Sequence, residues 1–334
     1  MKYITRNGAE LSNMTLGTSQ LGFNYGIAND AGMPDDTQGQ EMLRYTLDNG
    51  ITSIDTAQAY GESEGRIGAF IKSEKNRTPF ITTKLRLGFG LTGSFGGAVL
   101  SQDETKSLED SFSTVAGDLE KTVFEAAETS LKRLGLAKAN CIILHDPLEM
   151  MAGGGLIAKT MGKLVTAGYA NEVGVSVYHP AEADVMMQHD EYTVTQLPMN
   201  LFDQKMIHTG TLRKLKEKNF IVFVRSVFLQ GLFFLDPDKV EDPLLKEYAV
   251  GHIRELRRLA ANEGLSIAQL ALSFVRDTEG VTSLVLGCDN TDQIRENIRL
   301  MEGPSVSEKT MHDSRELFKD VNYEGIMVVL RRPK

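Results

Sequence analysis

The stretch SIDTAQAYGESEGRIGAFIK, residues 53–72, begins as a short apolar run and ends as an amphipathic helix. A carboxylate, Asp55, closes the apolar run, and a phenol, Tyr60, stands in the small polar turn that follows. An apolar strand that leads through a short turn into a helix is the repeating unit of parallel α/β folds. A connection alone would need neither the acid nor the phenol, so this turn predicts a functional site.

The same strand–helix unit recurs along the 334 residues. Helical stretches are expected at residues 38–49, 62–72, 119–134 and 252–262. Eight buried strands alternating with helices predict one α/β domain over residues 1–334, a closed (β/α)₈ TIM barrel. An open doubly wound sheet is the alternative, but its usual G-x-G-x-x-G is missing from the first turn, LGTSQLGFNYG. The expected strands are MTLGT from Met14, TSID from Thr52, FITTK from Phe80, CIILH from Cys141, EVGVSV from Glu172, TVTQL from Thr193, IVFVRS from Ile221 and TSLVLG from Thr282.

Three segments do not follow this alternation of strands and helices. KYITRNGAELSN, residues 2–13, predicts an N-terminal β-hairpin with a tight type I′ turn at Asn7-Gly8, placed to plug the barrel floor. Residues 87–117 are rich in Gly, Ser and Asp and are too long for an ordinary connection after the third strand. They are predicted to be an insertion on the catalytic face, either a lid or a surface loop. Beyond Leu300 we expect one more helical stretch and a polar tail.

Composition and charge exclude several classes of protein. With 41% hydrophobic and 24% charged residues the chain can bury a full core and is not disordered. A net charge of −9 argues against a general surface for nucleic acid or anionic membrane. No apolar run reaches the roughly 20 residues of a membrane helix, and no signal-peptide core is evident. With only two cysteines, Cys141 and Cys288, we expect a soluble, cytoplasmic protein of unassigned oligomeric state without disulfides. The scattered histidines predict no metal site.

Four polar side chains lie at or just beyond the ends of adjacent predicted strands: Asp55, Tyr60, Lys84 and His145. Because the carboxyl ends of barrel strands meet at one mouth, we expect them to lie together. A buried ammonium favours the phenolate, so Lys84 should lower the pKa of Tyr60 while Asp55 supplies the counter-charge. An imidazole opposite can orient a carbonyl oxygen. The set predicts a general acid that protonates an oxyanion as hydride reaches carbon.

In these features the sequence resembles the aldo-keto reductases, as a bacterial-type member. The resemblance implies a (β/α)₈ barrel that reduces a small aldehyde or ketone with a nicotinamide cofactor, usually NADPH. By analogy Tyr60 is the acid, Lys84 and Asp55 tune it, and His145 positions the carbonyl. The matching segments run in the order found in the family: GITSIDTAQAYGESEGRIGAFI, ITTKL, SLKRLGL, IILHDP, VGVSVY, TQLPMN and LVLGCDN…QIRENI.

The resemblance also implies a cofactor site, with departures from the family pattern. Val177 stands where the family has Asn, and Arg225 stands where an aromatic residue commonly stacks on nicotinamide. Gly287 and Gln293 replace the cations often used for the 2′-phosphate, and Asp289 adds negative charge, so NADPH is expected and NADH stays open. The implied cofactor contacts are Gly17, Thr18, Ser176, Gln196, Arg225, Ser226, Gln230, Gly231, Gly287, Cys288, Asp289, Gln293, Glu296 and Asn297.

Two other functions account for parts of the pattern. A non-catalytic barrel that binds nicotinamide cofactor as a sensor or regulatory subunit would not need an acidified tyrosine. A lyase or aldolase with Lys84 as its Schiff base is disfavoured by the neighbouring Tyr60 and Asp55. The segment LGTSQLGFNYGIAN resembles a bacterial subgroup associated with sugar metabolism, which suggests a sugar-derived aldehyde as substrate. The aromatic residues expected to rim the mouth are Phe23, Tyr25, Phe89 and Phe95.

Overall fold

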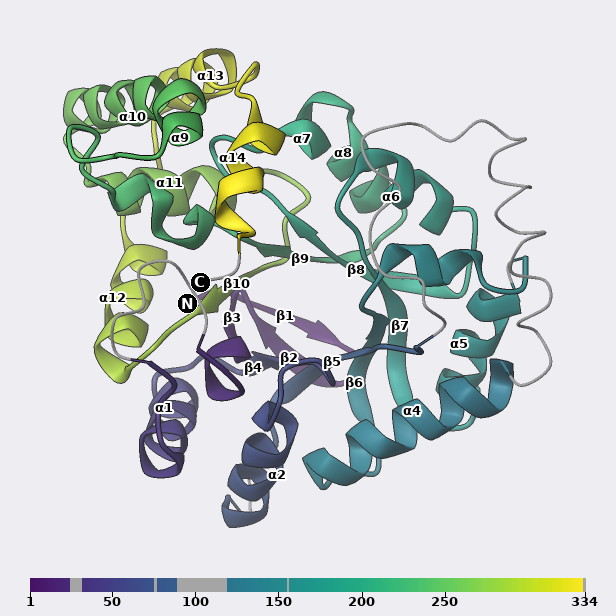
Figure 1. The fold of residues 1–334 in the computed structure, drawn as a ribbon. Helices are drawn as coiled ribbons and strands as arrows, with labels where there is room; N and C mark the ends of the chain where they lie inside the picture. The colour runs from purple at the N-terminus through teal and green to yellow at the C-terminus, as the bar shows by residue number, and fades with distance from the viewer. Residues whose placement is uncertain (25–31, 75–76, 89–118, 155, 333–334) are drawn as a thin grey trace.

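The computed structural model describes residues 1–24, 32–74, 77–88, 119–154 and 156–332 (Figure 1). Eight parallel strands form a ring in which β10 pairs with both β9 and β3, so the sheet is a closed barrel. The predicted barrel is confirmed and the open doubly wound sheet is excluded. The strands are β3 (Met14–Gly17), β4 (Ser53–Asp55), β5 (Phe80–Leu85), β6 (Ala139–Leu144), β7 (Ala170–Ser176), β8 (Tyr192–Pro198), β9 (Ile221–Arg225) and β10 (Ser283–Gly287).

Helices surround this ring, as Figure 1 shows. The four helices expected from the sequence correspond to α1, α2, α4 and α10, with ends displaced by at most two residues. The helices are α1 (Asp36–Asp48), α2 (Ser63–Ser73), α4 (Leu119–Leu134), α5 (Leu156–Thr166), α6 (Pro180–Met186), α7 (Lys205–His208), α8 (Thr211–Glu217), α9 (Pro243–Tyr248), α10 (Val250–Glu263), α11 (Ile267–Arg276), α12 (Thr291–Glu302), α13 (Glu308–Leu317) and α14 (Tyr323–Leu330), with 3₁₀ segments η1 (Ser19–Leu21), η3 (Pro147–Met151) and η4 (Leu229–Phe234).

The N-terminal hairpin closes the floor of the barrel. Strands β1 (Tyr3–Arg6) and β2 (Ala9–Ser12) are antiparallel, and Asn7 and Gly8 both have positive φ, as a type I′ turn requires. Leu11 is buried against Phe80 and Ile221, the first residues of two barrel strands. The predicted plug is therefore confirmed, and the opposite, carboxyl ends of the strands form the open mouth.

The chain after α12 differs from the sequence prediction of one helix and a polar tail, because the structure contains two helices. Ser307 caps α13 by accepting a hydrogen bond from the Thr310 N–H, and Asn322 caps α14 in the same way. Ile326 and Met327 are buried, so α14 is held by packing as well as by its cap. These two caps explain why the chain forms two helices after α12 instead of one.

The predicted insertion at residues 87–117 lies almost entirely outside the described residues. Its first two residues, Leu87 and Gly88, are described, and the Leu87 N–H donates to Glu149 Oε1 at 2.7 Å. Across the described ranges, no helix has both the length and the apolar composition needed to cross a membrane.

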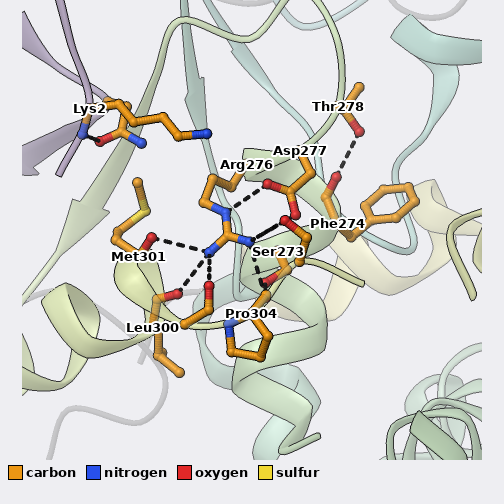
Figure 2. A network of polar contacts seen from close by, with 12 residues as sticks. Lys2, Ser273, Phe274, Arg276, Asp277, Thr278, Leu300, Met301 and Pro304 are labelled. Atoms are coloured by element: carbon orange, nitrogen blue, oxygen red, sulfur yellow. Dashed lines mark hydrogen bonds and ion pairs between the residues drawn. The ribbon is translucent and has the colours of Figure 1, made fainter. Parts of the chain in front are cut away.

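A buried guanidinium ties α11 to the end of α12 (Figure 2). Arg276, with 6% of its side chain exposed, donates from Nη1 to the carbonyl oxygens of Leu300, Met301 and Gly303 at 2.9–3.2 Å. Its Nε and Nη2 each bond a carboxylate oxygen of Asp277 at 2.8 Å. The last carbonyls of a helix have no partners within the helix, so Arg276 satisfies groups that would otherwise be buried without a bond.

Replacing Arg276 with Met should lower the free energy of unfolding by about 2–4 kcal/mol, because it strands several buried acceptors and the Asp277 carboxylate. Arg258, an exposed residue of α10 paired with Glu255, provides the matched control. Arg258→Met should cost less than about 1 kcal/mol. Urea denaturation of both variants checks the difference, and equal losses would contradict the assigned role.

Candidate active site

The register of the barrel brings the ends of the strands to one level around the mouth. Asp55 lies opposite Gly17, and Ser176 lies opposite Gln196 in the neighbouring strand. These side chains line a single cavity of about 560 Å³ that also includes Arg225 at the end of β9. The cavity lies at the carboxyl ends of the strands, where barrel folds carry their chemistry.

A buried polar network lines one part of this cavity. Lys84 Nζ donates to Asp55 Oδ2 at 2.6 Å and to the Thr56 carbonyl oxygen at 2.9 Å. Gln196 Nε2 donates to the other carboxylate oxygen of Asp55 at 2.8 Å. Lys84 is 1% exposed and Asp55 is 2% exposed, so each charge depends on the other for compensation.

Tyr60 is held above this network by the loop between β4 and α2. Its backbone N–H bonds the Ala57 carbonyl at 3.0 Å, and the Lys84 ammonium lies 4.8 Å from its ring centroid. The loop after β3 packs directly on it: a Cβ built at Gly22 would lie 1.8 Å from the Tyr60 carbonyl oxygen. Because only glycine allows this contact, the loop after β3 fixes the position of Tyr60 relative to Lys84 and Asp55.

The pKa of Tyr60 differs from the sequence expectation. Burial and the negative charge of Asp55 raise the pKa of Tyr60 above its ordinary value, whereas Arg225 opposes the increase. The expected lowering is wrong, because burial has the largest effect on this pKa and the negative charge of Asp55, which lies 2.6 Å from the Lys84 ammonium, adds to it. Tyr60 therefore keeps its proton throughout the neutral range and can act as a donor.

His145 follows β6 and faces the same space. Its ring packs edge-on against the Tyr60 ring at 5.9 Å, and its backbone N–H bonds the Leu85 carbonyl at 2.9 Å. Burial, together with the charges of Lys84, Arg86 and Arg225, lowers the pKa of His145 to about 3. At neutral pH the imidazole is therefore uncharged and can offer one N–H to an oxygen atom.

The low pKa of His145 predicts an acid-side loss of stability. Between pH 6.5 and about 3 the unfolded chain binds a proton at this position and the folded chain does not. The free energy of unfolding should therefore fall as the pH falls through this window, by at most about 1.4 kcal/mol per pH unit. Denaturant unfolding at several pH values should show a shallower dependence in His145→Asn. The exposed residue His312 of α13 provides the control, because His312→Asn should follow the wild type; parallel curves for all three proteins would refute the assignment.

The residues predicted to contact a cofactor lie around the same cavity, with one exception. Cys288 is buried in the core with 1% of its surface exposed, and its sulfur accepts a hydrogen bond from Asn297 Nδ2 at 3.2 Å. The Cys288 thiol thus faces the core and bonds Asn297, a residue that does line the cavity, and a cofactor contact at Cys288 stays a prediction. Val177, where the family has Asn, is also fully buried in the core. The predicted residues that do line the cavity are Gly17, Thr18, Ser176, Gln196, Arg225, Ser226, Gln230, Gly231, Gly287, Asp289, Gln293, Glu296 and Asn297.

The loop after β9 has an unusual backbone. Ser226, Leu229 and Gln230 have φ between 47° and 65°, and Gly231 has φ 93°. Non-glycine residues seldom adopt this left-handed region, and clusters of them are typical of binding sites. At the start of the loop, the Arg225 guanidinium lies 4.5 Å from the ring centroid of Tyr178. The loop therefore presents backbone groups and a stacked cation to one side of the cavity.

Several lining residues were not predicted from the sequence. Tyr178 follows Ser176 by two residues, so the alternation of the strand could have indicated it. Gln20 and Ser19, in the first turn, lie close together in η1, with the Ser19 hydroxyl donating to Gln20 Oε1 at 3.0 Å. Of the predicted rim aromatics, Phe23 packs edge-on against Tyr60 at 6.1 Å, and the other three lie outside the described residues. The remaining lining residues are Val227, Phe228, Phe234, Ala268, Val285, Leu286 and Leu300.

Comparisons with known proteins agree with the observed fold. A model of the aldo/keto reductase family matches residues 13–317. Aldo-keto reductase YhdN of Bacillus subtilis (strain 168) is 27% identical over 312 residues, which cover 87% of this chain and 85% of that protein. L-glyceraldehyde 3-phosphate reductase of Escherichia coli (strain K12) is 24% identical over 345 residues, covering 93% and 90%. The structure of aldo-keto reductase AKR11C1 from Bacillus halodurans in its holo form matches with a TM-score of 0.72 at 18% identity, covering 97% of this chain and 98% of that one. At that identity the structural match bears on the fold alone.

Proposed function

Because the chain belongs to the aldo/keto reductase family, we propose that it reduces an aldehyde or ketone to an alcohol with Tyr60 as the proton donor. The observation that carries the proposal is the arrangement at the mouth. A protonated phenol, a neutral imidazole and a buried Lys84–Asp55 pair line one cavity. Each has a distinct part in transferring a proton to a carbonyl oxygen.

The residues around the cavity fit a nicotinamide dinucleotide. The amide of Gln196 is oriented by its bond to Asp55, which leaves Oε1 to accept from a carboxamide NH₂. Ser176 adds a hydroxyl at the same level of the barrel, opposite Gln196. Ser226 and the left-handed backbone of residues 229–231 suit a pyrophosphate. When bound, the reduced nicotinamide supplies the hydride that is added to the carbonyl carbon.

The residues of this chain then complete the reduction. His145, uncharged at neutral pH, donates its one N–H to the carbonyl oxygen and orients it. Tyr60 transfers its phenolic proton to the same oxygen as negative charge develops there, and the product is an alcohol. The alkoxide is a stronger base than the phenolate, so a high pKa at Tyr60 still permits this transfer. Lys84 balances Asp55 and so limits the cost of the tyrosinate that remains until solvent restores the proton.

The two alternative functions are less well supported. A Schiff-base enzyme needs an accessible neutral lysine, whereas Lys84 is 1% exposed and bonds Asp55 and Thr56. A cofactor-binding sensor would need the dinucleotide site alone, and it would give no reason for His145 and Tyr60 to lie ring to ring. The proposed reductase accounts for both the buried Lys84 and the contact between the rings of His145 and Tyr60.

A substrate panel tests the proposed function. Tyr60, His145 and Tyr178 line the cavity and offer polar groups to a small hydroxylated aldehyde such as a sugar-derived one. One relative is named for a phosphorylated three-carbon aldehyde. The family resemblance predicts NADPH and leaves NADH open, so both reduced cofactors belong in the assay. Cofactor oxidation with at least one aldehyde or ketone is expected, and binding of cofactor without turnover of any carbonyl compound would favour the sensor.

A further inference from the structure

We propose that the end of the cavity at the start of α12, where the family resemblance places the adenosine of the cofactor, selects NADH over NADPH, with Asp289 and Glu296 as the residues that determine this specificity. The inference rests on the proposed function and concerns only the choice between the two cofactors. It runs against the family expectation of NADPH.

The cavity carries its charges at separate ends. Its described lining includes two cations, Lys84 and Arg225, and both stand at ends of strands close enough to influence the pKa of His145. The α12 end is lined instead by Asp289, Gln293, Glu296 and Asn297, two carboxylates and two amides. A phosphate monoester with nearly two negative charges would meet like charge there.

The start of α12 uses its own side chains to satisfy its backbone. Asn290 Oδ1 accepts from the Gln293 N–H at 3.0 Å, and Gln293 Oε1 accepts from the Asp289 N–H at 2.8 Å. Gln293 Nε2 also donates to Asp289 Oδ2 at 3.1 Å. A helix N-terminus attracts phosphate through N–H groups that lack partners. Here the Gln293 N–H is already bonded to Asn290, and the Asp289 carboxylate is held beside it by Gln293 Nε2. A 2′-phosphate at this position would have to displace these bonds.

The nearby cations of α12 are engaged elsewhere. Arg295 donates to Tyr45 and lies 2.5 Å from Asp292, on the side of the helix that faces α1. Arg299 is paired with Glu296 at 3.7 Å and does not line the cavity. Neither arginine is among the described residues that line the cavity. The charged side chains that line this end of the cavity are therefore Asp289 and Glu296, and Glu296 shares an ion pair with Arg299.

Carboxylates suit NADH, which lacks the 2′-phosphate. The adenosine ribose of NADH carries two hydroxyls, which donate hydrogen bonds that a carboxylate accepts. In dinucleotide-binding folds an acidic side chain in this role favours NAD, and a cation accommodates the 2′-phosphate of NADP. The donors and acceptors at this end of the cavity thus match a free 2′-hydroxyl.

Direct titration tests the inference without turnover. The chain has no tryptophan, so the fluorescence of the reduced nicotinamide itself should be followed as protein is added. The dissociation constant of NADH should be lower than that of NADPH by about tenfold or more, because the 2′-phosphate meets like charge in a partly buried site, where water screens the repulsion less than in bulk solution. The difference should shrink as salt rises, since salt screens the repulsion.

Three charge-neutralising variants locate the effect. Asp289→Asn and Glu296→Gln should each narrow the ratio of the two dissociation constants by about two- to fivefold, mainly through tighter NADPH binding. Asp292→Asn is the matched control, because Asp292 lies in the first turn of the same helix but is 81% exposed, pairs with Arg295 and does not line the cavity. In Asp292→Asn the ratio of the NADH and NADPH dissociation constants should stay close to that of the wild type.

The outcomes separate this inference from the proposed function. Tighter binding of NADPH than of NADH, or equal binding, would overturn the inference and leave the reductase intact. A preference for NADH that neither Asp289→Asn nor Glu296→Gln narrows would overturn the assignment to these residues. Binding of neither cofactor would overturn the proposed function and the inference together.

Discussion

Replacing Tyr60 with phenylalanine is expected to reduce carbonyl turnover by about 10²–10⁴-fold, the usual contribution of a positioned general acid. The substitution removes the hydroxyl and keeps the ring that packs against His145 and Phe23. The loop should therefore hold its shape, and the dissociation constant of the cofactor should change little. A proton donor acts in the transition state, so the loss should appear in kcat rather than in ground-state binding.

Tyr169 supplies the control for this experiment. Its hydroxyl bonds Glu128 on the outer helices, far from the mouth in the fold, and it does not line the cavity. Tyr169→Phe should turn over substrate like the wild type. If Tyr60→Phe retained substantial activity, another group would have to be the acid.

Replacing Lys84 with methionine should damage both stability and activity. The substitution leaves Asp55 buried with no opposing cation, and removing one partner of a buried ion pair costs about 3–5 kcal/mol. Turnover should fall sharply as well, because the charge of Asp55, which already raises the pKa of Tyr60, would no longer be balanced. Denaturant unfolding and steady-state kinetics measure the two effects.

Two companion variants separate stability from chemistry. Lys163 pairs with Glu120 on the surface and is 53% exposed, so Lys163→Met should cost less than about 1 kcal/mol. Adding Asp55→Asn to Lys84→Met should recover part of the lost stability, because the stranded charge is gone. It should not recover turnover. Recovery of both together would mean that the pair serves only the fold.

Much of this architecture could be predicted from local sequence. The strand FITTKL is buried at all six positions, so its apolar run was a reliable signal even with a lysine inside it. Asn7-Gly8 determined the hairpin, because both residues adopt the left-handed conformation that a type I′ turn requires. The catalytic candidates were found because strand ends in a barrel converge, which makes position along the chain a guide to position in space.

Other features depend on distances that a sequence does not contain. The lowered pKa expected for Tyr60 was wrong because burial of the phenol raises its pKa more than any neighbouring charge does, and the carboxylate of Asp55 raises it further. Cys288 and Asp289 are adjacent, yet one side chain faces the core and the other lines the cavity. Which of the two side chains faces the core depends on the path of the backbone between β10 and α12. Arg276 gave no signal as a helix cap because its carbonyl partners lie 24–27 residues away.

Transfer of deuterium tests the central claim most directly. Wild-type protein and Tyr60→Phe would each be incubated with an aldehyde from the panel and with reduced cofactor carrying deuterium at the transferable position of nicotinamide C4. Mass spectrometry then locates the label in the product. We predict an alcohol with deuterium on the carbinol carbon from the wild type, and a rate of its formation in Tyr60→Phe that is lower by about two orders of magnitude or more. Absence of labelled alcohol from the wild type, or its formation at equal rates by both proteins, would contradict the account.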